Sequence, residues 1–71
     1  MTRYLVIIEP TATGYSAYSP DLPGCVTTAD SRDDVELRMR DAVTAHLEEF
    51  RAGGERAPEP SSIATYVEVA A

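Results

Sequence analysis

The stretch that decides the fold is YSAYSPDLPGCVTTADSRDD, residues 15–34. It begins with alternating aromatic and small residues, which are typical of a β-strand. It ends with a serine and acidic residues, which are typical of a helix start. Between these two parts lies PDLPGC. Its residues fit two roles, a rigid turn or the mouth of a site in which Asp21 is an acid and Cys25 a nucleophile.

The two prolines favour the turn. Each fixes its φ angle and lacks an N–H group, so a hydrogen-bonded strand cannot continue through them. The Pro23–Gly24 pair fits the central positions of a type II turn, in which glycine tolerates the positive φ of the second position. We therefore predict a structural turn before a short strand at residues 25–28. The turn consists of Pro20, Asp21, Leu22, Pro23 and Gly24.

Upstream of the turn, the sequence predicts a β-hairpin. Residues 3–9 (RYLVIIE) are rich in β-branched and aromatic residues and are apolar at both alternating sets of positions, which indicates a central strand. Residues 11–14 (TATG) are typical of a turn, and residues 15–19 alternate as a second strand.

Downstream of the turn, the sequence predicts one amphipathic helix. Ser31 is a good N-cap, and Asp33 and Asp34 place negative charge in the first turn. Gly53 and Gly54 end the helix, since glycine readily takes the left-handed conformation that closes helices. Apolar residues and one histidine recur at steps of three and four and form one stripe. They are Val35, Met39, Ala42, Val43, His46, Leu47 and Phe50.

The remaining residues predict a fourth strand. Residues 55–62 (ERAPEPSS) form a linker with two prolines, and residues 63–70 (IATYVEVA) alternate again. The order β-β-β-α-β predicts an α+β domain of two layers with a three-stranded antiparallel meander. If the fourth strand runs parallel to its sheet neighbour, a right-handed crossover places it beside the first strand. No second helix covers the other sheet face, which makes that face or an edge strand an interaction site.

Size and charge restrict the function. The 71 residues suffice for one domain, residues 1–71, whose small core favours a homo-oligomer, either a dimer or a tetramer. The net charge of −6 argues against direct nucleic-acid binding and favours a basic partner. Cys25 is the only cysteine, which fits a reducing cytoplasm. No apolar run is long enough to span a membrane.

Catalytic chemistry has few candidates. Asp21, Cys25 and His46 could form a small hydrolase or nuclease site if the fold brought them together. However, His46 lies on the apolar helix stripe, and the carboxylates near residue 31 are explained by helix capping. We expect no catalytic residue, no cofactor and no metal site.

The run GYSAYSPDLPGCV, residues 14–26, is followed by the acidic capped helix and then by PEPSS. Together these motifs resemble the HicB-like antitoxin family over nearly the whole chain. The resemblance implies a partial RNase H-like fold without nuclease activity. It also implies a partner, a small basic mRNA-interferase toxin of the HicA type, which the antitoxin neutralises by covering its surface. Among the candidate residues, Tyr18, Asp21, Asp33 and Glu36 are the partner contacts that we expect.

The chain departs from the family pattern at two positions and in its length. Ala29 stands where many relatives have glycine, and Val35 stands where many have alanine. Two-domain relatives also carry a C-terminal DNA-binding module that represses their operon, and we expect this chain to lack it. A stand-alone homo-oligomer without a toxin is the alternative function.

Overall fold

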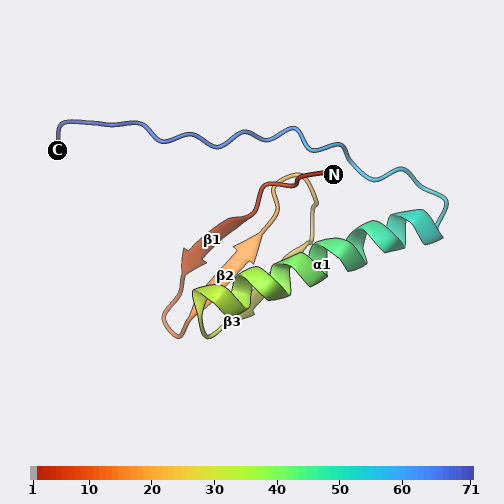
Figure 1. The fold of residues 1–71 in the computed structure, drawn as a ribbon, viewed down its shortest axis with the longest axis horizontal. Helices are drawn as coiled ribbons and strands as arrows, with labels where there is room; N and C mark the ends of the chain where they lie inside the picture. The colour runs from red at the N-terminus through yellow and green to blue at the C-terminus, as the bar shows by residue number, and fades with distance from the viewer. Residues whose placement is uncertain (1) are drawn as a thin grey trace.

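The computed structural model describes residues 2–71, in which one helix packs across one face of a three-stranded antiparallel sheet (Figure 1). The strands are β1 (Ile7–Pro10), β2 (Tyr15–Tyr18) and β3 (Val26–Ala29), and they lie in the order β1-β2-β3. The helix, α1, spans Arg32–Ala52. The predicted α+β architecture of two layers is confirmed.

The strand register sorts the side chains between the two sheet faces. Ala17 of β2 pairs with Ile8 of β1 and with Thr27 of β3, and Ala17 is fully buried beneath α1. Because side chains alternate along a strand, the neighbouring residue Tyr18 lies on the opposite face. Its register partners there are Ile7 and Val26.

The segment between β2 and β3 is the predicted turn. The backbone N–H of Cys25 donates to the carbonyl of Leu22 over 3.0 Å, and Gly24 has a φ of 83°. Both observations match a type II turn with Pro23 and Gly24 at its centre. The turn also directs the Leu22 side chain into the core, where it is fully buried.

The ends of α1 also follow the prediction. The Ser31 hydroxyl accepts a hydrogen bond from the Asp34 N–H over 3.1 Å, as an N-cap residue does. At the other end, Gly53 is the C-cap and Gly54 has a φ of 72°. The helix is therefore closed at both ends by residues local to it.

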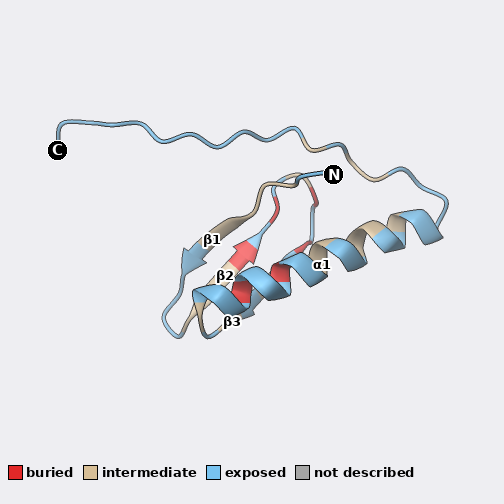
Figure 2. Cartoon of the chain, viewed as in Figure 1, coloured by how far each residue is buried: buried red, intermediate tan, exposed pale blue. Residues whose placement is uncertain are grey.

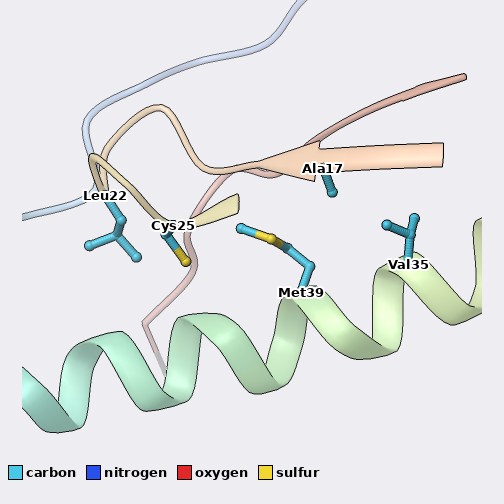
Figure 3. Packing of buried hydrophobic residues seen from close by; sticks show 5 residues of the cluster. All are labelled: Ala17, Leu22, Cys25, Val35 and Met39. Carbon is cyan, nitrogen blue, oxygen red and sulfur yellow. The ribbon is translucent and has the colours of Figure 1, made fainter. Parts of the chain in front are cut away.

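The core is small and lies where α1 crosses the turn and β2. Figure 3 shows the side chains of Val35 and Met39 from α1 facing the sheet and turn side. The buried apolar residues are Ala17, Leu22, Cys25, Val35 and Met39. Farther along α1, Val43 and Leu47 are only half-buried, and the last turns of the helix extend beyond the sheet (Figure 2).

The fourth strand is the one predicted element that the structure does not contain. Residues 63–70 are extended but belong to no strand, and they run away from the body of the molecule (Figure 1). The first strand also begins later than predicted, at Ile7, because the residues before it lack a pairing partner. Ile7 pairs with Tyr18, the last residue of β2, so residues 3–6 have no ladder partner on that side. On their other side the fourth strand would be the partner.

The positive φ of Gly24 makes it sensitive to substitution. In Gly24→Ala, the added Cβ meets no atom within 4 Å, so the cost is backbone strain, about 1–2 kcal/mol of unfolding free energy. Gly53→Ala is the matched control, because Gly53 has a φ of −82° and the new Cβ makes ordinary contacts. That control should be neutral or stabilise the protein by about 0.4–1 kcal/mol. Urea denaturation of both variants measures the difference, and equal stabilities would contradict the turn assignment.

Candidate functional site

Asp21 in the turn holds the linker that follows α1. One of its carboxylate oxygens, Oδ2, accepts hydrogen bonds from the backbone N–H groups of Ser61 and Ser62, each over 3.1 Å. The other, Oδ1, accepts from the two serine hydroxyls, over 3.2 and 2.8 Å. We call this arrangement the Asp21 clamp. It joins two segments that are 40 residues apart in the sequence.

These hydrogen bonds favour the ionised carboxylate. The pKa of Asp21 lies below its ordinary value of 3.8, chiefly because the Ser62 backbone N–H and then its hydroxyl donate to the charged form. The donors of Ser61 act in the same direction, whereas desolvation opposes them. Asp21 is therefore a charged structural acceptor at neutral pH. A general acid needs the opposite pKa shift.

A second contact ties the linker to the start of the chain. The Tyr4 hydroxyl donates to the Pro58 carbonyl over 2.6 Å. Residues 58–62 are thus held at two points, one near the N-terminus and one at the turn between β2 and β3. Together these contacts determine where residues 63–70 leave the body.

The fold does not form the Cys25–His46 pair on which a hydrolase would depend. Cys25 is only 3% exposed, and its burial raises the pKa of the thiol, which favours the unreactive protonated form. His46 instead lies 6.0 Å from Phe50, measured between ring centroids. It lines a shallow hollow with Glu49, Phe50 and Glu55, away from Cys25.

The geometry also gives no support for a metal site among the described residues. Within residues 2–71, no three side chains from histidine, cysteine, aspartate and glutamate lie close enough to hold a metal ion. Asp33 and Asp34 instead occupy the first turn of α1, where they interact favourably with the helix dipole.

The sheet face opposite α1 exposes apolar side chains. Ile7, Tyr18 and Val26 are register partners across all three strands and form one apolar row on it. Tyr18 is 42% exposed and Val26 is 61% exposed. The sequence predicts an uncovered face but not the place of Val26 in it, because the register that aligns these residues cannot be read from the sequence.

The four predicted partner contacts do not share one surface. Tyr18 lies on the uncovered sheet face, whereas Glu36 lies on α1 beside residues 2–8. Asp33 is exposed in the first turn of α1. Asp21 uses its carboxylate within the chain, in the clamp. Ser61 and Ser62 were not predicted as site residues. Two adjacent serines offer four donors, but no local signal in the sequence indicates which carboxylate they bind.

A groove runs between residues 2–8 and α1, with a volume of about 920 Å³. We call it the β1–α1 groove. Its apolar lining consists of Tyr4, Val6, Ile8, Met39, Val43 and Leu47. Arg3, Arg32 and Arg40 also line it, together with the single acidic residue Glu36. The groove is therefore apolar, with mainly basic charged residues.

The motifs of the turn, the helix start and the linker match one known family. The family model described as the HicB-like antitoxin of a bacterial toxin–antitoxin system matches residues 4–70. The chain belongs to this family. The match includes both partners of the Asp21 clamp and the extended segment at residues 63–70.

Two curated relatives are similar in sequence to this HicB-like chain. It is 30% identical over 64 residues to an uncharacterised 14.9 kDa protein of Haemophilus phage HP1, encoded in the rep-hol intergenic region. That alignment covers 90% of this chain but only 48% of the phage protein, so the chain spans about half the length of that relative. It is also 28% identical over 61 residues to the UPF0150 protein Ta0767 of Thermoplasma acidophilum. Here the alignment covers 84% of this chain and 88% of the relative.

A solved structure supports the family assignment. The HicB-like chain superimposes on a chain of the HicA3 and HicB3 toxin–antitoxin complex with a TM-score of 0.71 and 27% sequence identity. The match covers 84% of this chain and 70% of the other. In the part of this chain that the structure describes, no helix is long and apolar enough to cross a membrane.

The lowered pKa of Asp21 predicts how the linker responds to acid. Because the folded pKa is depressed, the clamp contributes stability above the unfolded value of 3.8, and that contribution is lost as the pH falls through the folded pKa. We expect the Ser61 and Ser62 amide resonances to titrate with a midpoint below 3.8. NMR spectra recorded across this range measure the midpoint.

The matched variants for this experiment are Asp21→Asn and Asp30→Asn. Asp21→Asn removes the charge and should abolish the titration and expose both serine amides to faster hydrogen exchange. Asp30 is an exposed aspartate on the same domain, and its substitution should change neither measurement. Serine amides that exchange equally in both variants would show that Asp21 does not hold the linker.

Proposed function

We propose that this chain is an antitoxin that binds and neutralises a small basic mRNA-interferase toxin of the HicA type. The observation that carries the proposal is the family match over residues 4–70. The likeness to a chain of the HicA3 and HicB3 complex supports it. The net charge of −6 suits a basic partner, since opposite charges speed association and exclude wrong partners.

We place the toxin contact on the uncovered sheet face. The row of Ile7, Tyr18 and Val26 offers adjacent apolar side chains that no other element covers within the described residues. Aromatic residues at the centre of an apolar patch contribute strongly to protein binding. Of the contacts predicted from the sequence, Tyr18 lies in this row, and Asp33 and Glu36 supply acidic charge elsewhere on the domain. We assign Asp21 an indirect role through the clamp.

In this proposal the chain is a cytoplasmic protein with a partial RNase H-like fold and no enzymatic activity. The buried thiol of Cys25 and its separation from His46 argue against covalent catalysis. The occupied carboxylate of Asp21 argues against a role in acid–base chemistry.

The experiment begins with the chain isolated gently from its native cells, followed by native mass spectrometry. A small basic protein bound at fixed stoichiometry, which stops growth when expressed alone and is neutralised by this chain, is the expected result. A chain without such a partner would overturn the proposal. So would metal-dependent RNA cleavage by the purified chain that is lost in Asp21→Ala.

Val26→Asp tests the proposed contact face. It places a charge in the apolar row and should weaken toxin binding by about 2 kcal/mol or more, roughly 30-fold, measured by calorimetry. Leu37→Asp is the matched control, because Leu37 is a similarly exposed apolar residue, 57% against 61%, and lies on α1. Equal affinities for the two variants would move the contact away from this sheet face.

A further inference from the structure

Residues 63–70 expose an apolar strand-like segment. Ile63 is 91% exposed, Val67 is 77% exposed and Val69 is 76% exposed. In a strand formed here, these residues and Thr65 would lie on one mainly aliphatic face, and Tyr66 and Glu68 would lie on the other. An extended segment with such side chains in water is a template for strand pairing.

The β1–α1 groove offers a site of matching shape. β1 is an edge strand that pairs only with β2 in the described part of the chain, and residues 2–6 continue it without a ladder partner. The groove beside this edge is lined by apolar side chains from both layers, including Val6, Met39 and Leu47. A strand added to this edge would direct one of its faces into the groove.

The charges in the groove argue against a basic occupant. Three of the six basic residues of this acidic chain line the groove, namely Arg3, Arg32 and Arg40, against one acidic residue, Glu36. A basic toxin would meet like charge there. Residues 63–70 carry no basic residue, so they would meet no like charge in the groove.

The Asp21 clamp determines the direction in which the segment leaves. Residues 61 and 62 are fixed at the turn between β2 and β3, and Pro58 is fixed by Tyr4. Beyond the clamp the segment extends past the body of the molecule (Figure 1), and none of its residues lines the groove of its own chain. A segment held in this way is available to the same groove in another copy.

We propose that residues 63–70 of one copy pair with the free edge of β1 in a second copy, which returns its own segment. The exchange forms a two-fold symmetric dimer in which each β1–α1 groove is filled by the partner's strand. Ile63, Val67 and Val69 face the groove, and Tyr66 and Glu68 face the other side of the sheet. This dimer is independent of the proposed antitoxin function, because it requires no toxin.

Sedimentation equilibrium of the purified chain tests the dimer. We expect twice the chain mass of 7.7 kDa for the full chain and a single chain mass for residues 1–62. The shortened chain keeps the core, since no residue of the segment belongs to it. A monomeric full chain, or a shortened chain that still dimerises, would overturn the proposal.

Two aspartate substitutions test the two faces of the segment one at a time, without disturbing the core. Val67→Asp places a charge on the face directed into the groove and should abolish the dimer. Tyr66→Asp places the same charge on the adjacent, fully exposed residue and should leave the mass unchanged. If both variants remain dimeric, the segment does not form the interface.

Isotope-mixed NMR identifies the chain whose groove is filled. In a sample mixed from labelled and unlabelled copies, we expect contacts from the Val67 methyl groups to Val6 or Leu47 of the other copy. Contacts confined to one chain would show that the segment closes on its own sheet. Contacts that form only after a toxin is added would assign the segment to the toxin. Either result would overturn strand exchange.

Discussion

The packing of α1 against the middle of the sheet is the interaction on which the rest of the structure depends. Ala17 at the centre of β2 has a side chain small enough for Val35 and Met39 to approach closely, and the turn adds Leu22 and Cys25 to the same cluster. Because only five apolar residues among residues 2–71 are buried, the domain has little excess stability.

The local parts of this architecture could be predicted from the sequence. Ser31 at the start of α1, the two glycines at its end and Pro23–Gly24 in the turn each act through neighbouring backbone groups, so their chemistry is visible in short windows. Val35 and Met39, which α1 contributes to the core, belong to the apolar stripe that the helical period predicts.

The non-local parts could not be predicted in the same way. Residues 63–70 have the alternation of a strand, but alternation does not specify a partner, and the same pattern fits pairing within one chain or between two. The clamp between Asp21 and the two serines depends on a contact across 40 residues. The resemblance to the antitoxin family included both segments, yet it did not indicate that they bind each other.

The exposed segment after the clamp also affects how readily proteases degrade the protein. Proteases bind their substrates as extended chain, and segments without hydrogen bonds to the folded body are the preferred sites of cleavage. Residues 63–70 meet both conditions in the isolated chain, whereas the clamp keeps residues 61 and 62 attached to the turn. Degradation would therefore begin beyond the clamp, and any partner that pairs with the segment would lengthen the protein's lifetime.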